Sequence, residues 1–181
     1  MKIACLGWGS LIWDPGKLLT RGEWKKDGPK IPLEYKRQSN DGRLTLVIDP
    51  DSEPLTTLWI LMGTDDLAQA KESLRSREKT NVINIGNALS GEISSDPIRL
   101  AIINWAKEQN LDAVIWTNLA VKFSGQAVGP TLEEAIAYLD TINDEKLEKA
   151  KEYIIKTPLQ INTVFRKRFA AKYGWADLST I

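Results

Sequence analysis

The chain of 181 residues is long enough for one domain with a substantial core, and its 43% hydrophobic content is typical of a globular protein. Its 24 basic and 24 acidic residues balance, so no net charge drives it toward nucleic acid or an anionic membrane. Histidine is absent and Cys5 is the one cysteine, which excludes Ser-His-Asp and Cys-His catalysis, histidine-ligated zinc and an internal disulfide. Acid–base chemistry would therefore need Asp, Glu, Lys or Tyr.

The first half of the chain is predicted to consist mainly of strands. The apolar run at residues 3–6 predicts a buried strand, in which Cys5 is expected to be an inert core residue. Residues 14–30 contain several glycines and prolines and predict a long irregular region. Further strands are expected at residues 33–39, 43–49 and 55–63, with a hairpin turn at 40–42.

The second half is predicted to be mainly helical. Asp96 with Pro97, and Thr131 with Glu134, are typical of helix N-termini. One helix is predicted at residues 64–78 and a final one at residues 161–174. Three more helices are predicted to start at residues 96, 131 and 144. Short strands are predicted at residues 82–85 and 113–116. Strands first and helices later indicate an α+β domain rather than alternating β-α-β units.

The segment Gly7-Trp8-Gly9-Ser10-Leu11-Ile12-Trp13-Asp14-Pro15-Gly16 directly follows the first predicted strand. Glycine lets a group approach the main chain closely, and rows of amide N–H groups bind a carboxylate or a developing oxyanion. The segment is therefore either a ligand-binding loop or a plain turn. It lacks the Gly-Lys-Ser/Thr of a phosphate loop and the third glycine of a Rossmann fingerprint.

Glu78 is the second candidate, in the segment Leu74-Arg75-Ser76-Arg77-Glu78-Lys79 at the end of a predicted helix. It is either an acid–base group or a solvated glutamate among surface charges. Residues 165–175 leave a similar choice, because they mix basic and aromatic side chains as nucleic-acid-binding surfaces do. A final amphipathic helix with a solvated face explains that mixture equally well.

Together these segments resemble the ChaC-like γ-glutamylcyclotransferases. Residues 7–16 resemble the family's Gly-Tyr-Gly-Ser-Leu-Ile-Trp-x-Pro-Gly opening, and residues 35–43 resemble its Arg/Gln/Ser segment. Trp59 lies in a strand at the place of the family's Trp-Gly-x-x-Tyr strand. Residues 74–79 resemble its Leu-Asp-x-Arg-Glu-Lys segment, which holds the catalytic glutamate. The matches follow the family's order over residues 3–79, whereas residues 86–181 match no part of it.

The resemblance implies a γ-glutamylcyclotransferase-like fold, in which a small mixed β-barrel is flanked by helices. We expect residues 1–181 to form a single domain with a helical C-terminal half. The implied activity is cyclisation of a γ-glutamyl amine or peptide to 5-oxoproline with release of the amine, and Glu78 would be the general acid/base. The implied substrate-binding residues are Gly7, Trp8, Gly9, Ser10, Leu11, Arg37 and Ser39.

The chain also departs from the family at several positions. Trp8 stands where the family has Tyr, Thr80 and Asn81 stand where it has Gly-Tyr, and the strand at Trp59 lacks the glycine and tyrosine. Two alternatives therefore stay open: a non-catalytic small-molecule-binding or regulatory protein on the same fold, and an enzyme with a different amide-cleaving reaction. We expect a small-molecule γ-glutamyl substrate, no cofactor or metal, no nucleic-acid or membrane partner and a cytoplasmic location, with the oligomeric state left open.

Overall fold

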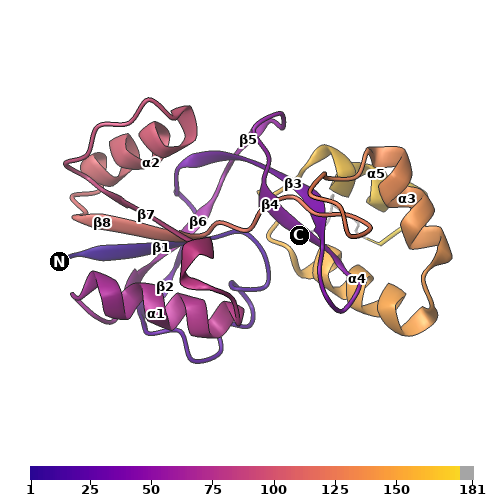
Figure 1. Cartoon of the computed structure of the whole chain (residues 1–181), viewed down its shortest axis with the longest axis horizontal. Helices are drawn as coiled ribbons and strands as arrows, with labels where there is room; N and C mark the ends of the chain where they lie inside the picture. The colour runs from indigo at the N-terminus through magenta and orange to yellow at the C-terminus, as the bar shows by residue number, and fades with distance from the viewer. Residues whose placement is uncertain (176–181) are drawn as a thin grey trace.

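The computed structural model describes residues 1–175, which form two β-sheets and five α-helices (Figure 1). In chain order the elements are β1 (Ile3–Gly7), β2 (Thr20–Lys25), β3 (Lys30–Gln38), β4 (Leu44–Ile48), β5 (Pro54–Thr56), β6 (Leu58–Met62), α1 (Leu67–Glu78), a 3-10 turn (Val82–Asn84), β7 (Ile85–Leu89), α2 (Pro97–Glu108), β8 (Ala113–Thr117), α3 (Leu132–Thr141), α4 (Asp144–Lys156) and α5 (Val164–Tyr173). No helix in this part of the chain has both the length and the apolar character needed to cross a membrane.

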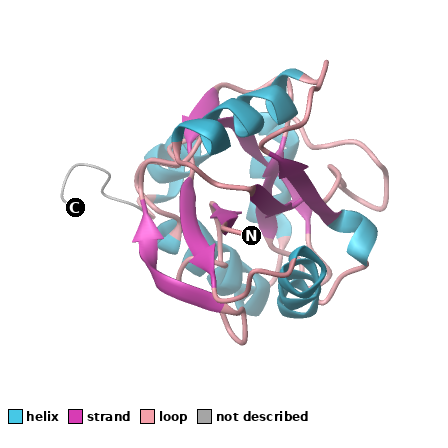
Figure 2. Ribbon diagram, turned by 90° about the vertical axis from the view of Figure 1, so that its left-hand side faces the viewer, coloured by secondary structure: helices cyan, strands magenta, loops and turns pink. Residues whose placement is uncertain are grey.

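The larger sheet has the strand order β2-β6-β1-β8-β7, with β1 at its centre. Strand β1 runs antiparallel to β6 and parallel to β8. Every residue of β1 is buried, because α1 lies on one side of the sheet and α2 on the other (Figure 1). The continuous apolar run at residues 3–6 is the expected pattern for a strand covered on both faces. Figure 2 shows the same arrangement from the side, with helices flanking the strands.

The two sheets are joined where one stretch of chain crosses between them. Strand β5 pairs with β3 in the smaller sheet, β6 pairs with β1 in the larger one, and only Thr57 separates them. Thr57 is fully buried, and its hydroxyl donates to the Pro29 carbonyl oxygen at 2.8 Å. The Gly28 N–H in turn donates to the Thr57 carbonyl oxygen at 3.0 Å. These bonds fix how the sheets meet.

The smaller sheet, β4-β3-β5, carries the C-terminal helices. Tyr35 of β3 packs edge-on against Tyr153 of α4 and Phe169 of α5, with ring centroids 6.2 and 5.8 Å apart. Arg166 of α5 is 1% exposed, and its guanidinium donates to carbonyl oxygens at the end of α4, including that of Thr157 at 2.5 Å. Arg166 therefore does not belong to the solvated face that one interpretation of residues 165–175 assigned to the basic side chains. It caps α4 instead.

The α+β class is confirmed, but the small mixed β-barrel is not what residues 1–175 form. Their strands make two separate sheets and no closed barrel. The physical reason is the turn at Gly28 and Pro29, after which β3 pairs with β4 and β5 instead of continuing alongside β2. Strands β2 and β7 are left as the edges of the larger sheet.

Several strand predictions are confirmed, and three local ones are wrong. The strands at residues 3–6, 33–39, 43–49 and 113–116 are present, and Asp96 and Thr131 cap α2 and α3. Residues 14–30 contain β2, an edge strand that is mostly exposed and irregularly paired, so no apolar pattern marks it. Residues 82–84 form a 3-10 turn capped by Asn81. The run at residues 55–63 is two strands.

The C-terminal half is interleaved with the N-terminal half. Strand β8 lies between β1 and β7 inside the larger sheet, and α2 packs against β3, β7 and β8. A fragment ending before β8 would therefore lack an interior strand. The expectation of a single domain over residues 1–181 stays a prediction, and its last six positions, 176–181, lie outside the described residues.

Gly28→Ala tests the crossing at Thr57. A Cβ on Gly28 would lie 2.6 Å from the Thr57 carbonyl oxygen, so the backbone must shift. We expect the free energy of unfolding to fall by about 1–3 kcal/mol. Gly91→Ala is the matched control, because a Cβ there meets nothing within 4 Å, and its change should stay within about 0.5 kcal/mol. Urea unfolding measures both; equal effects of the two substitutions would contradict the role given to Gly28.

Candidate functional site

A cavity of about 1160 Å³ opens between the two sheets. One side is formed by the loop after β1 and the C-terminal end of α1, and the other by the β3–β4 hairpin and α4. All the site residues expected from the sequence lie along it: Gly7, Trp8, Gly9, Ser10, Leu11, Arg37, Ser39 and Glu78. The structure thus brings together residues that are up to 71 positions apart in the chain.

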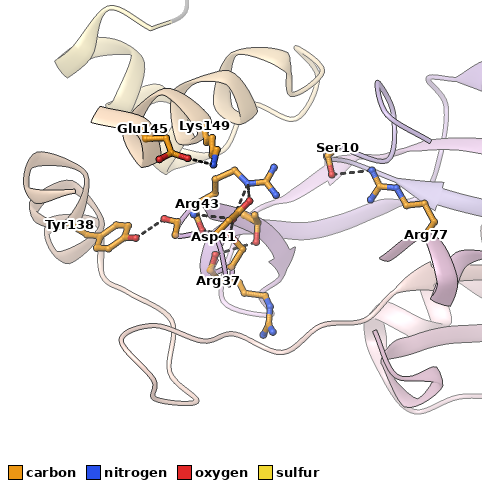
Figure 3. A network of polar contacts seen from close by, with 11 residues as sticks. Ser10, Arg37, Asp41, Arg43, Arg77, Tyr138, Glu145 and Lys149 are labelled. Atoms are coloured by element: carbon orange, nitrogen blue, oxygen red, sulfur yellow. Dashed lines mark hydrogen bonds and ion pairs between the residues drawn. The ribbon is translucent and has the colours of Figure 1, made fainter. Parts of the chain in front are cut away.

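The cavity carries charges of both signs. Its charged residues are Asp14, Lys17, Arg37, Asp41, Arg43, Glu72, Arg77, Glu78, Lys79, Lys149 and Glu152. Figure 3 shows Arg77 on one side and Arg43 on the other, with their guanidinium groups directed toward the space between them. Such a mixed surface suits a ligand that itself carries both an ammonium and a carboxylate group. In residues 1–175, no group of three or more His, Cys, Asp or Glu side chains is placed to hold a metal ion.

Glu78 is the last residue of α1. The helix begins at Asp66, whose carboxylate accepts from the N–H groups of Ala68 and Gln69, and it ends where Lys79 adopts a left-handed conformation with φ of 50°. A non-glycine residue in that conformation costs on the order of 1 kcal/mol. This conformation ends the helix at Glu78, whose side chain lines the cavity and is only 15% exposed.

Arg77 connects Glu78 to the glycine-containing loop. Its Nη2 donates to Ser10 Oγ at 3.2 Å (Figure 3) and to the Asp14 carbonyl oxygen at 2.6 Å. Its Nη1 lies 2.6 Å from Glu78 Oε1. The Arg77 side chain is 11% exposed. One guanidinium thus holds the loop and the carboxylate in a fixed relation, because its planar fork of donors satisfies several acceptors at once. Sequence reasoning did not assign this role.

The loop after β1 leaves backbone N–H groups at the cavity. Its own turns are closed by Ile12 N–H to Gly9 O at 3.0 Å and Asp14 N–H to Ser10 O at 2.9 Å. Among the residues that the structure describes, the N–H groups of Gly9, Ser10 and Leu11 have no protein acceptor. A ligand oxygen that carries negative charge is the natural partner for such a group of donors.

The remaining predicted residues lie at the cavity with different surroundings. Arg37 donates to the Ala120 carbonyl oxygen at 2.6 Å and, within residues 1–175, has no carboxylate partner. Its positive charge is therefore available to a ligand. Ser39 is committed to the hairpin turn, where its hydroxyl donates to Asp41 and to the Arg43 carbonyl oxygen. Trp8 is 6% exposed and belongs to the core as well as to the cavity surface.

Gly7 is explained by packing. A Cβ on Gly7 would lie 2.7 Å from side-chain atoms of Ile12 and Trp24, so both side chains would have to move to admit a larger residue. Cys5 lies two residues before Gly7 in β1 and is 0% exposed. The pKa of its thiol is raised by burial and, second, by the negative charge of Glu78. Cys5 is therefore a neutral core thiol, as expected, and not a nucleophile.

Tyr153 is a second residue at this site whose role the sequence did not reveal. It comes from α4, is 5% exposed and lies at the cavity beside the loop. A signal was present in the sequence, because Tyr153 falls on the apolar face that α4 presents through Ala150 and Ile154. A tyrosine in such a face brings a hydroxyl that needs a polar surrounding.

Comparison of the chain with protein-family models, with curated proteins and with solved structures finds no match in any of the three. The resemblance of residues 3–79 to γ-glutamylcyclotransferases therefore stays a prediction.

Arg77→Gln tests the connection between loop and helix. Removing the guanidinium leaves Glu78 without its ion pair and the Asp14 carbonyl without its donors, so we expect the free energy of unfolding to fall by about 2–3 kcal/mol. Hydrogen exchange of the Ile12 and Asp14 amides should accelerate.

Arg75→Gln on the same helix is the control. Arg75 pairs with Glu72 at 2.6 Å, but both side chains are well exposed, at 35% and 60%. Its loss should therefore change stability far less and leave the loop amides protected. Similar effects of the two substitutions would contradict the role assigned to Arg77.

Proposed function

We propose that this protein is a γ-glutamylcyclotransferase-type lyase that converts a γ-glutamyl amine or peptide to 5-oxoproline and the free amine. The proposal is carried by one observation: a largely buried carboxylate, Glu78, shares a cavity with a loop whose Gly9–Leu11 N–H groups have no acceptor in residues 1–175. The resemblance of both segments to the family supports it. A cytoplasmic location belongs to the same proposal.

The reaction suits a chain that has no histidine. The α-amine of the substrate attacks its own γ-carbonyl carbon, a C–N bond forms within the substrate, and the bond to the departing amine breaks. Over the whole reaction two protons leave the attacking nitrogen, and the departing amine carries both away as an ammonium ion. Glu78 would accept a proton from the attacking nitrogen and return one to the leaving nitrogen. Because the nucleophile is part of the substrate, the protein mainly has to fold and orient it.

The loop and Arg37 would hold the two oxygen-bearing ends of the γ-glutamyl group. In the tetrahedral intermediate the γ-carbonyl oxygen becomes an oxyanion, and the N–H groups of Gly9–Leu11 are the donors for it. The α-carboxylate needs a cation, and Arg37 is a cavity cation without a carboxylate partner in the described part of the chain. In this assignment the protein contributes only side chains and backbone groups. We therefore keep the sequence-based expectation that no cofactor takes part.

Incubation of the protein with a panel of γ-glutamyl amines and γ-glutamyl peptides tests the proposal, with 5-oxoproline measured by mass spectrometry. We expect at least one compound to be converted, and Glu78→Gln to reduce kcat by about 10²–10⁴-fold, because the amide cannot accept the proton. Glu92→Gln is the matched control: it also breaks a Glu–Arg pair of 2.6 Å, to Arg99, but lies away from the cavity, and its activity should equal that of the unmodified chain.

The alternatives have distinct outcomes in the same experiment. A ligand that binds the protein without 5-oxoproline being formed would favour the non-catalytic binding or regulatory protein. Release of the amine with free glutamate as the second product would favour a different amide-cleaving enzyme. Turnover that survives in Glu78→Gln would exclude Glu78 as the acid–base group.

A further inference from the structure

Tyr153 places its hydroxyl against the loop that holds the free N–H groups. A Cβ on Gly9 would overlap the Tyr153 hydroxyl oxygen, so only glycine leaves room for it. Gly9 does not have a positive φ, and conformational freedom is thus not the reason for the glycine. The close approach of the phenol to the main chain is the reason.

The hydroxyl of Tyr153 has a free proton to donate. The tyrosines Tyr35, Tyr138 and Tyr173 each donate their hydroxyl proton to a protein oxygen, whereas Tyr153 donates to none within residues 1–175. Tyr153 is nevertheless almost fully buried and lines the cavity. The Tyr153 oxygen faces the backbone N–H of Leu46, which can donate to it, so only the proton of the hydroxyl lacks a protein partner. Because a buried hydroxyl normally donates as well as accepts, a ligand in the cavity is the acceptor for that proton.

The ring of Tyr153 is held in place from several sides. Trp13 packs edge-on against it with ring centroids 5.4 Å apart, and Tyr35 does the same at 6.2 Å. The Arg43 guanidinium lies 5.5 Å from its ring centroid. A donor held in this way needs little reorganisation when charge develops in front of it, which is the condition for effective electrostatic catalysis.

The phenol stays protonated across the physiological range. Burial, and after it the negative charge of Glu78, raises the pKa of Tyr153 to about 12. A phenol in this state donates a hydrogen bond but does not readily give up its proton.

From this geometry we infer that the Tyr153 hydroxyl and the N–H groups of Gly9–Leu11 form one oxyanion-binding group. The inference rests on the proposed function. When the α-amine attacks, the π electrons of the γ-carbonyl move to its oxygen, and Tyr153 donates a hydrogen bond to that oxyanion. When the bond to the departing amine breaks, the electron pair returns to the carbonyl. No bond of the phenol breaks, so the proton traffic stays with Glu78.

The inference gives the C-terminal helices a function in the reaction. Tyr153 comes from α4, whose end is fixed by Arg166 and by Thr157, which donates to the Tyr153 carbonyl oxygen at 2.8 Å and accepts from Tyr35. Glu78 comes from α1 on the other side of the cavity. The oxyanion group is therefore complete only when α4 packs on the smaller sheet.

Tyr153→Phe removes the hydroxyl and keeps the ring. With a substrate that the unmodified protein converts, we expect kcat to fall by about 10²–10³-fold, as for loss of one oxyanion donor. KM should change by less than about threefold, because the bond forms only in the transition state. Tyr173→Phe is the control: it removes a hydroxyl that donates to Asp140 Oδ1 at 2.8 Å, neither residue lines the cavity, and its kcat should match that of the unmodified protein.

Binding without turnover separates a direct role from a structural one. The probes are 2-amino-4-phosphonobutanoate, which has a tetrahedral oxyanion at the γ position, and glutamine, which has a neutral planar amide there. Calorimetry should show that Tyr153→Phe weakens binding of the phosphonate about tenfold or more and of glutamine by much less, because a hydrogen bond to a charged oxygen is the stronger one. Equal weakening of both probes would indicate a structural role and overturn the inference.

Gly9→Ala is a second test, which perturbs the same contact from the side of the loop. The added methyl displaces the hydroxyl, so kcat should fall, and the cost should shrink in the Tyr153→Phe background. Strictly additive costs would overturn the inference. An unchanged kcat in Tyr153→Phe would also overturn the inference. If the unmodified protein is active, that result leaves the proposed function intact. If the unmodified protein neither converts γ-glutamyl compounds nor binds the phosphonate, the proposed function fails and the inference fails with it.

Discussion

The site depends on one guanidinium. Arg77 reaches Glu78, Ser10 and Asp14 from a single position near the end of α1, and it is the direct connection between the carboxylate and the loop after β1. Without it the loop would lose its bonds to α1, and the Glu78 carboxylate would lose its ion pair. Removing one member of a charge pair this little exposed leaves the other charge uncompensated, so the pair holds the site in one arrangement.

The fold supplies the two sides between which this connection operates. The crossing at Thr57 sets the smaller sheet against the larger one, so the β3–β4 hairpin and α4 face the loop and α1 (Figure 1). The larger sheet is completed late in the chain by β8, and α4 is fastened through Arg166 and Tyr35. The cavity is thus a product of long-range pairing, because no short segment of the chain contains both of its sides.

Much of this could be predicted where local chemistry decides. The buried run of β1, the hairpin turn at 40–42 and the capping residues Asp96 and Thr131 act within a few residues, and their elements are present. The residues expected at the site also line one cavity. The predictions that failed concern non-local contacts. Strand β2 is an exposed edge strand, and the barrel does not close because of the turn at Gly28. Arg166 is buried because it caps the end of α4, a contact that forms only on folding. Tyr153 escaped for the same reason, since its neighbour Gly9 is far away in the sequence.

The central claim is that Glu78 and the Gly9–Leu11 loop act on one γ-glutamyl group. A crystal structure of Glu78→Gln with an unreacted γ-glutamyl compound tests it most directly. The account predicts the γ-carbonyl oxygen within hydrogen-bonding distance of the N–H groups of Gly9–Leu11, with the α-amine beside residue 78. A γ-glutamyl group bound elsewhere on the protein, or in the cavity with its α-amine remote from residue 78, would contradict it.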